Sequence, residues 1–334
     1  METPFCNLLG IKVPIGQAPI GVAAVPALAA AVSNAGALGT LALTGRGTEG
    51  ALNMIKKTRE LTNEPFCVNF LLPYVGSWEE ELEVALEEKV PAINLFWGDP
   101  KPLVDRIHGA GSILIMQVGS VKEALYAAEC GTDLIIAQGW EAGGHVRGEV
   151  GTLSIVAEVV NTVSRVPVLA AGGISDGRGL AAALALGAAG VWIGTRFLAS
   201  KEAHVPSEYI KRILRASADD TVHTTIFDRT WPAAPHRALR NSTYVEWERA
   251  GCPPHGERPG EGDILASDSS GYQVQRYEAY TPSIELKGDI EALALWSGQG
   301  VGLVDKIQPA ATIVEELITN AKDSIEKVSA MLSS

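Results

Sequence analysis

The sequence has few charged residues, and they are unbalanced toward acid. Only 20% of the 334 residues are charged, and 27 lysines and arginines face 39 aspartates and glutamates, for a net charge of −12. No stretch is rich in lysine or arginine, so the chain lacks the basic surface that nucleic acids or anionic membranes require. Because 46% of the residues are hydrophobic, the chain can bury a large core, which excludes a disordered protein. We therefore expect chemistry on a small molecule.

Cysteine is also scarce. The four cysteines, Cys6, Cys67, Cys130 and Cys252, lie far apart, with no Cys-x-x-Cys pair and no histidine at metal-ligand spacing. This pattern is typical of reduced thiols and predicts no metal site. The N-terminus has no basic segment followed by an apolar run and a small-residue cleavage site. We therefore expect no secretory signal and a cytoplasmic protein.

No apolar run is long and continuous enough to suggest a membrane span. The segment from Val13 to Gly45 carries no charge, but three prolines and five glycines interrupt it. We interpret this segment as two buried strands around a helix, and we expect no membrane partner.

Short runs rich in valine, isoleucine and leucine alternate with helical patterns along most of the chain, which is typical of repeated βα units. Most of these runs are apolar throughout, as in a parallel sheet that is covered on both faces. Strands are predicted at 13–20, 38–44, 65–72, 92–97, 112–118, 134–138, 166–171 and 191–196. Helices are predicted at 27–35, 48–61, 78–88, 101–110, 121–129, 153–164, 179–186 and 309–331.

Eight βα units within about 200 residues predict an α/β protein built on a closed (β/α)8 (TIM) barrel, with an open doubly wound sheet as the alternative. We predict that residues 1–219 form the barrel. Residues 220–288 hold six of the 18 prolines and six glycines, and they are predicted to form a smaller inserted domain over the barrel mouth. Residues 289–334 are predicted to return to the barrel and to end in a helix that packs on it.

Glycines gather where the last two predicted strands end, and (β/α)8 enzymes carry their sites at strand ends. Gly172 and Gly173 follow the seventh strand, and Gly194 and Thr195 follow the eighth. Glycine lets backbone N–H groups approach a phosphate closely. We predict that these residues hold a phosphate group; the alternative is that the glycine pair only makes a tight turn.

The loop after the sixth strand contains the string Ala137-Gln-Gly-Trp-Glu-Ala-Gly-Gly-His145. Its glycines leave a backbone without side chains beside His145, whose ordinary pKa lets it hold or release a proton near neutrality. We predict that His145 is catalytic. Glu141 is predicted either to orient a neighbour or to cap a helix.

Three neutral amides, Gln17, Asn69 and Gln117, lie at or near predicted strand ends. An amide both donates and accepts hydrogen bonds, which suits the polar edge of a planar heterocycle. Each amide alone is compatible with a satisfied core position. Together with a phosphate site they suggest a flavin mononucleotide (FMN) across the barrel mouth.

These pieces resemble the nitronate monooxygenase family, which includes NAD(P)H:quinone reductases and a flavin-dependent enoyl-acyl carrier protein reductase. The matching strings are Gln17-Ala-Pro, Pro65-Phe-Cys-Val-Asn69, the loop that ends at His145, Ala170-Ala-Gly-Gly-Ile174, Gly194-Thr-Arg-Phe197 and Ser297-Gly-Gln-Gly300. They follow the family's order over nearly the whole chain. The resemblance implies a (β/α)8 barrel with a smaller second domain and noncovalently bound FMN.

The resemblance also implies roles for individual residues. It assigns contacts with the isoalloxazine or ribityl part of FMN to Gln17, Ala18, Asn69 and Gln117. It assigns the phosphate and its approach to Gly144, Gly172, Gly173, Gly194 and Thr195, with Gly298 and Gln299 closing the site. His145 matches the family's active-site histidine. An extra residue in the loop shifts Arg147 by one position, so its role toward an anionic substrate stays open.

The implied reaction is the FMN-dependent oxidation of alkyl nitronates, or of nitroalkanes, by O2 to a carbonyl compound and nitrite. The alternatives are an NAD(P)H-dependent flavin reductase acting on quinones or an enoyl thioester, and a flavin-binding protein without turnover. Zinc chemistry is not expected, because the later histidines lack paired ligand spacing. These are His204, His223, His236 and His255, interpreted as solvated or structural. The sequence leaves the oligomeric state open, with a homodimer as one option.

Overall fold

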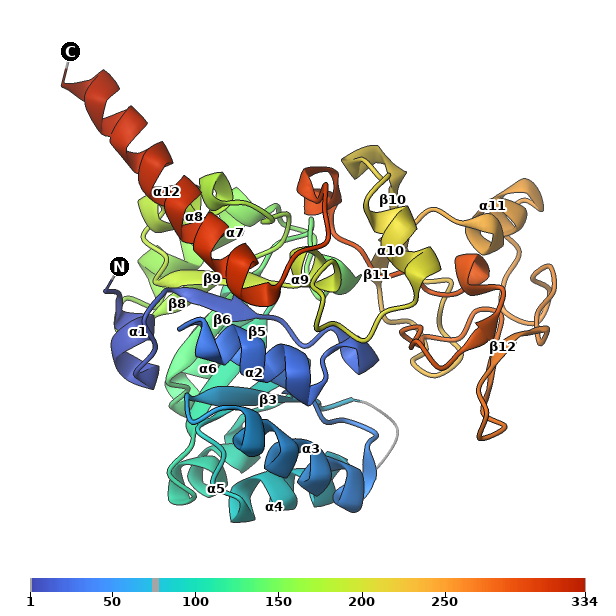
Figure 1. Cartoon of the computed structure of the whole chain (residues 1–334), viewed down its shortest axis with the longest axis horizontal. Coiled ribbons are helices and arrows are strands. Elements are labelled where there is room, and N and C mark those ends of the chain that lie inside the picture. The colour runs from blue at the N-terminus through green and yellow to red at the C-terminus, as the bar shows by residue number, and fades with distance from the viewer. Residues whose placement is uncertain (1, 74–77, 334) are drawn as a thin grey trace.

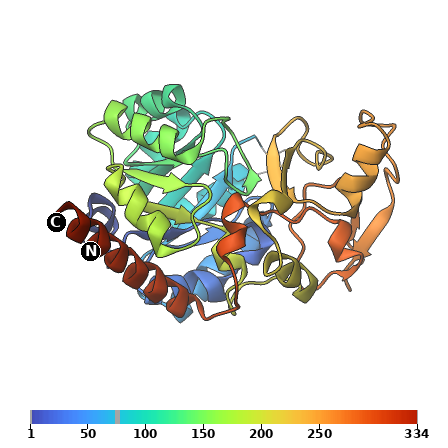
Figure 2. The same cartoon turned by 90° about the horizontal axis from the view of Figure 1, so that it is seen from above.

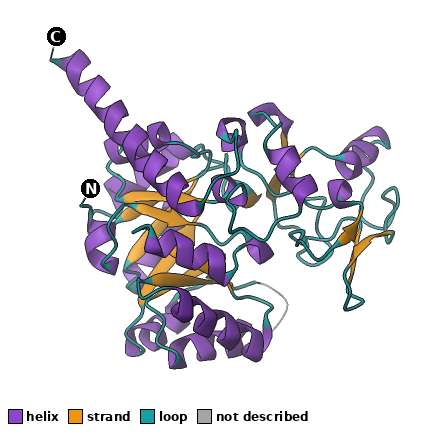
Figure 3. Cartoon of the chain, in the orientation of Figure 1, coloured by secondary structure: helices purple, strands orange, loops and turns teal. Residues whose placement is uncertain are grey.

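The structure is a computed structural model of the chain, and it describes residues 2–73 and 78–333. The outer ends of the predicted domains, residues 1 and 334, lie outside the described residues. Eight parallel strands form one sheet in the order β1-β9-β8-β6-β5-β4-β3-β2, with helices around it (Figure 3). All eight strands that the sequence predicts are present.

The strands of the barrel are β1 (Ile15–Gln17), β2 (Gly39–Ala42), β3 (Phe66–Leu71), β4 (Ala92–Phe96), β5 (Ile113–Val118), β6 (Leu134–Gln138), β8 (Val168–Ala171) and β9 (Gly190–Ile193). The predicted helices appear as α2 (Pro26–Asn34), α3 (Gly47–Leu61), α4 (Trp78–Glu87), α5 (Val104–Gly109), α6 (Val121–Cys130), α7 (Thr152–Thr162), α8 (Gly177–Ala185) and α12 (Ala310–Leu332). Helices that the sequence patterns did not predict are α1 (Pro4–Leu9), α9 (Thr195–Leu198), α10 (Ser207–Ile213) and α11 (Ser242–Arg249). Short 3-10 turns lie at Gly21–Ala23, Lys101–Leu103, Ala218–Asp220, Ile290–Ala292 and Gln299–Leu303.

The first and last strands of the sheet meet, which makes it a closed barrel and excludes the open sheet. Gly16 forms a parallel bridge with Leu38, and the Gln17 N–H donates to the Leu38 carbonyl at 2.9 Å. The fully buried Gln17 side chain continues this ladder. Its Oε1 accepts from the Thr40 N–H at 2.9 Å, and its Nε2 donates to the Ala18 carbonyl. The Gln17 side chain thus makes hydrogen bonds that a longer strand β1 would make with its backbone.

The interior of the barrel is filled from its N-terminal end. Phe5 on α1 is fully buried and packs in one hydrophobic cluster with Leu38, Ile115 and Trp192. A second cluster lies between the strands and the surrounding helices, as expected for a parallel sheet that is buried on both faces. With one end filled, the C-terminal ends of the strands remain as the place for a site.

The C-terminal helix α12 runs along the outside of the barrel (Figures 1 and 2). It packs on α8 and α2, and Leu317 and Ala321 are buried there. The contact is close, because a Cβ at Gly177 would come within 2.4 Å of the Leu317 carbonyl oxygen. No described helix is both long and apolar enough to cross a membrane.

A second unit lies beside the barrel mouth and contains α10 and α11 (Figure 1). It has two small sheets, of which the first is β10 (Thr221–Thr224), β11 (His236–Leu239) and β7 (Gly144–His145). The second is β13 (Gln273–Gln275), β12 (Ile264–Ser267) and β14 (Lys287–Gly288). Strand β7 belongs to the barrel loop after β6, so this loop completes a sheet of the second unit. One hydrophobic cluster joins Leu198 and Tyr209 to Leu293 and Leu295, on both sides of position 219, and the predicted domain boundary there stays a prediction.

The side chain of Gln17 should contribute to the stability of the barrel. Gln17→Leu leaves the buried Thr40 N–H without its acceptor, and such a loss costs about 1 to 3 kcal/mol. Urea unfolding is expected to show this decrease. The matched change Gln273→Leu on the exposed face of β13 should alter the unfolding free energy little. An equal effect of both changes would contradict the role of Gln17 in barrel closure.

Candidate active site

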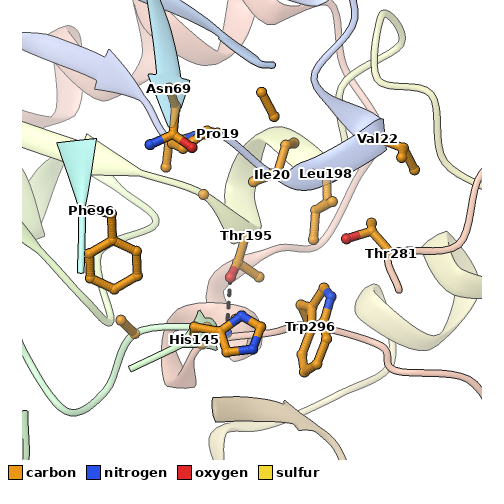
Figure 4. Close-up of a pocket in the computed structure, with 18 of the residues that line it drawn as sticks. Pro19, Ile20, Val22, Asn69, Phe96, His145, Thr195, Leu198, Thr281 and Trp296 are labelled. Carbon is orange, nitrogen blue, oxygen red and sulfur yellow. Dashed lines mark hydrogen bonds between the residues drawn. The ribbon is translucent and has the colours of Figure 1, made fainter. Parts of the chain in front are cut away.

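A cavity of about 740 Å³ lies at the C-terminal ends of the barrel strands. Its wall combines barrel residues such as Asn69 and Phe96 with Thr281 and Trp296 from the later part of the chain (Figure 4). This volume lies in the range of cofactor and substrate sites. The cavity is therefore large enough for a planar cofactor together with a small substrate.

Glycines form one side of the cavity, where the loops after β6 and β8 meet the late segment. Gly172 and Gly173 have φ values of 116° and 67°, in the region that favours glycine. A Cβ at Gly300 would come within 2.7 Å of the Gly173 carbonyl oxygen. Thr195 closes this side, because its Oγ1 accepts from the Gly298 N–H at 3.0 Å. The structure brings to the cavity wall the predicted residues Gly144, Gly172, Gly173, Gly194, Thr195 and Gly298.

Ser175 adds a hydroxyl group to this glycine-lined side. It lines the cavity, and its buried Oγ has no hydrogen-bond partner among the described residues. Leaving such a group unpaired is costly, which indicates a ligand that supplies the missing partner. Sequence reasoning missed Ser175, although it stands two residues after Gly173 in the same predicted loop.

Two of the predicted amides face the cavity and differ in how they are held. Asn69 donates through Nδ2 to Asn94 Oδ1 at 2.7 Å, and Asn94 itself donates to the Ile115 carbonyl at 3.3 Å. The Gln117 side chain, only 8% exposed, makes no hydrogen bond with the part of the chain that the structure describes. Asn69 is thus fixed in place, while Gln117 has its full donor and acceptor capacity available. Ala18 also lies in the wall.

The other two predicted contacts need correction. Gln17 is not part of the described cavity wall, because both ends of its amide are used in closing the barrel. Gln299 is also absent from the described wall, and its N–H donates to the Glu141 carbonyl at 2.9 Å. Gln299 therefore joins the late segment to the loop after β6, while its glycine neighbours reach the cavity.

His145 lies at the cavity wall on β7, held by contacts on two sides. Gln138 at the end of β6 donates from Nε2 to the His145 carbonyl at 2.8 Å, and its Oε1 accepts from the Arg147 N–H at 3.0 Å. On the other side β7 pairs with β11, where His145 stands opposite His236. The string of small residues before His145 thus becomes an edge strand of the second unit.

Indole rings surround the imidazole of His145. Its ring centroid lies 4.1 Å from that of Trp231 and 5.4 Å from that of Trp296, as Figure 4 shows for Trp296. The buried Nε2 has no hydrogen-bond partner among the described residues. Burial, and to a smaller extent the nearby His236, hold the pKa of His145 well below its ordinary value. The imidazole is therefore neutral at neutral pH, with an unused nitrogen.

His236 is a fixed neutral partner. Its Nδ1 lies 2.9 Å from the Ala234 carbonyl, and the Phe227 N–H donates to its Nε2 at 3.3 Å. Nδ1 therefore carries the proton and Nε2 accepts. Burial lowers the pKa of His236 to about 4. Because both nitrogens are used by backbone groups, His236 is structural. No group of possible metal ligands occurs among the described residues.

Glu141 and Arg237 hold the loop between β6 and β7. The Glu141 carboxylate accepts from the Thr152 N–H at 2.8 Å and from its hydroxyl at 2.7 Å, so it caps the first turn of α7. Arg237 on β11 is 1% exposed. Its Nη2 donates to the Trp140 carbonyl at 3.0 Å, and its guanidinium lies 4.1 Å from the Trp140 ring centroid. Sequence reasoning missed Arg237, because only the packing of β11 on this loop brings it there.

Arg147 does not reach the described cavity wall. Its Nε donates to Glu123 at 2.7 Å, and its guanidinium lies 5.0 Å from the Trp97 ring centroid. Arg46 is the only lysine or arginine in the described wall. Arg46 follows β2 and lies near Tyr280, and no sequence motif had pointed to it.

Comparisons with known proteins identify the family of the chain. The sequence model of the nitronate monooxygenase family matches residues 2–81 and 74–320. A nitronate monooxygenase of Pseudomonas aeruginosa is 32% identical, covering 95% of this chain and 99% of its own. The (3aS,4S,5R,7aS)-5-hydroxy-7a-methyl-1-oxo-octahydro-1H-indene-4-carboxyl-CoA dehydrogenase of Mycobacterium tuberculosis is also 32% identical, covering 99% of each chain. The solved structure of FabK from Thermotoga maritima has a TM-score of 0.85 and 34% identity, covering 99% of each chain.

The family model spans most of the chain, and the relatives match it nearly from end to end. The sequence resemblance is thereby confirmed at the level of family and fold. The chain belongs to the nitronate monooxygenase family and is a flavin-dependent oxidoreductase built on a (β/α)8 barrel.

Proposed function

We propose that the protein binds FMN in this cavity and oxidises alkyl nitronates with O2 to a carbonyl compound and nitrite. The observation that supports this most is the neutral, unpaired imidazole of His145 at the wall of a cavity with a glycine-lined side. A neutral imidazole can donate one hydrogen bond or accept one proton, but it is a poor acid. This suits a substrate that is already an anion and needs only a hydrogen-bond donor.

The residues present fit FMN. The glycine-lined side, Thr195 and the unpaired Ser175 hydroxyl would hold the phosphate, because hydroxyl groups and close backbone N–H groups suit its oxygens. Asn69, Gln117 and Ala18 would contact the heterocycle. FMN supplies the redox chemistry when it is bound, and the protein supplies placement and electrostatics.

His145 would act directly on the substrate. Its N–H can hydrogen-bond the nitro oxygens of a nitronate, which places the negative carbon over the cofactor site. The indole rings of Trp231 and Trp296 beside it keep bulk water away and strengthen these interactions.

The volume of the cavity favours one second candidate, an NAD(P)H-dependent reductase or a dehydrogenase that acts on a thioester. About 740 Å³ leaves space for a substrate larger than a short nitronate, and one relative is a CoA-thioester dehydrogenase. Reduction of an enoyl thioester adds a proton to carbon and needs a good acid at that position. The low pKa of His145 favours the nitronate reaction over this one.

Anaerobic spectroscopy tests the two functions against each other. The purified protein, saturated with FMN, is mixed without O2 with ethyl nitronate and in parallel with NADH or NADPH. We expect loss of the oxidised flavin absorbance with the nitronate alone. Bleaching only by the reduced pyridine nucleotide would replace the proposal with the reductase, and a protein that cannot be loaded with flavin would contradict both.

Replacement of His145 should affect turnover and not cofactor binding. His145→Ala removes a group that contacts the substrate, and such a loss typically costs about 10²-fold or more. We expect kcat/KM with ethyl nitronate to fall by at least about 10²-fold while FMN stays bound. The matched change His204→Ala, at a histidine that pairs with Glu285 outside the described wall, should leave turnover intact. Equal turnover of both variants would contradict the assignment.

Arg237 should act as a positioning residue for the loop that carries His145. Arg237→Lys keeps the charge but loses the forked contact with the Trp140 carbonyl, and a small displacement of a catalytic group can cost up to about 10²-fold. We expect a lower kcat with little change in the Kd for FMN. Arg258→Lys is the control, because this buried arginine pairs with Asp228 and Glu261 away from the loop. A similar kcat for both variants would show that Arg237 serves stability alone.

The neutral histidines should make the protein less stable in mild acid. The pKa of His236 is about 4 in the folded protein, against an ordinary value of 6.5. Below pH 6.5 this histidine binds a proton in the unfolded chain, but in the folded chain it binds one only near pH 4. The free energy of unfolding therefore falls as the pH drops through this range. We expect a loss of about 2 kcal/mol between pH 7 and pH 5 from this residue. Urea unfolding of His236→Gln should show a smaller loss, and an unchanged pH dependence would contradict the argument.

A further inference from the structure

The described cavity wall contains two charged side chains. Arg46 is its only lysine or arginine and Asp268 its only carboxylate. Arg46 follows β2 and His145 follows β6, and these strands stand four places apart in either direction around the eight-stranded barrel. The ends of β2 and β6 therefore lie on opposite sides of a mouth roughly 15 Å across, as eight strands about 4.8 Å apart and tilted by about 36° require.

The guanidinium of Arg46 is only partly used. Its Nε donates to the Ala42 carbonyl at 3.2 Å, while its two terminal nitrogens have no hydrogen bond or ion pair with the residues that the structure describes. Burial lowers its pKa from 12.5, yet an arginine stays charged at neutral pH. A half-buried cation with free donors at a cavity wall needs an anionic or strongly polar partner.

The charge of Glu81 acts on Arg46, but neither Glu81 nor Asp268 makes a hydrogen bond with its guanidinium among the residues that the structure describes. The Glu81 carboxylate accepts from the Gly45 N–H at 3.0 Å and from the Gly47 N–H. Asp268 Oδ1 accepts from the Ser270 hydroxyl at 2.6 Å and from the Tyr272 N–H at 3.0 Å, which closes its own turn. Both charges still act on the site, so Asp268 should weaken the binding of an anion that Arg46 favours.

The phosphate side of the cofactor site does not account for Arg46 either. The glycine-lined side follows β8 and β9, whereas Arg46 follows β2, with β1 between them in the barrel. Tyr280 of the second unit also lines the cavity and lies close enough to Arg46 for their charges to interact. Its hydroxyl group adds a donor and acceptor to this part of the wall.

We infer that Arg46 is the anchor of a substrate subsite for a carboxylate or phosphate group, which the substrate carries at the end remote from its reacting carbon. This inference rests on the proposed function for the position of the reacting carbon at His145. The substrate would span the mouth, with its anionic end at Arg46 beside Tyr280. The subsite selects by charge and by length, since a short nitronate at His145 cannot reach Arg46.

Binding of unreactive six-carbon probes tests this subsite without turnover. The protein, saturated with FMN, is titrated with hexanoate, hexyl phosphate and hexanol, and binding is followed by the fluorescence of the cavity tryptophans and by the flavin spectrum. An arginine–anion contact is expected to make one or both anions bind about ten- to hundredfold more tightly than hexanol. The better of the two anions identifies the group as a carboxylate or a phosphate.

Charge variants test whether each charged residue strengthens or weakens the binding of the anions. Arg46→Met should abolish the preference for the anions, and Arg46→Lys should retain part of it. Asp268→Asn should tighten anion binding severalfold, because it removes the competing charge. Arg165→Met removes the same charge from an exposed position on the barrel surface and should change nothing. Melting temperature and flavin content confirm that each variant is folded.

Two outcomes would overturn the subsite: equal affinity of the wild-type protein for hexanol and both anions, or a preference that survives in Arg46→Met. Failure of the proposed function is separate, because it would appear as an absence of flavin reduction by ethyl nitronate. If that reaction fails while Arg46-dependent anion binding holds, the subsite belongs to a different oxidation or reduction at the same cavity.

Discussion

The site depends on one backbone pairing, that of β7 with β11. Through this pairing the loop after β6 leaves the barrel and becomes a strand of the second unit, with His145 opposite His236. Gln138 fixes the loop from the barrel side and Arg237 from the other side. Without the second unit, the backbone at Gly144 and His145 would lack the hydrogen bonds to β11. The imidazole of His145 would then not be held in one position.

The same pairing determines the chemistry of His145. It places the imidazole among Trp231, Trp296 and the neutral His236, where water is excluded and a positive charge is disfavoured. The result is a histidine that stays neutral when its ordinary pKa would have it half protonated in mild acid. The cost appears in stability, because the unfolded chain gains protons at a pH where the folded one does not.

The cavity distributes its polar groups by position in the barrel. Backbone and hydroxyl groups gather after β8 and β9, neutral amides lie at the ends of β3 and β5, and the single arginine of the described wall follows β2. Each group lies on a strand end, so the barrel acts as a rigid frame that sets the separations between them. In the proposed subsite, this arrangement would let one cavity bind a long molecule by unlike groups at its two ends.

The sequence by itself determined the barrel, because the eight apolar runs and their spacing are local patterns that the parallel sheet requires. It also located glycines of the cavity wall and His145, which lie within short strings beside strand ends. Tertiary structure alone decided the rest. In sequence, Gln17 resembles the amides Asn69 and Gln117, which also lie near strand ends. In the fold, both ends of its side chain make hydrogen bonds that close the barrel. Arg237 and Arg46 carry no local signal, since only folding brings Arg237 beside Trp140 and Arg46 into one cavity wall with residues of the second unit.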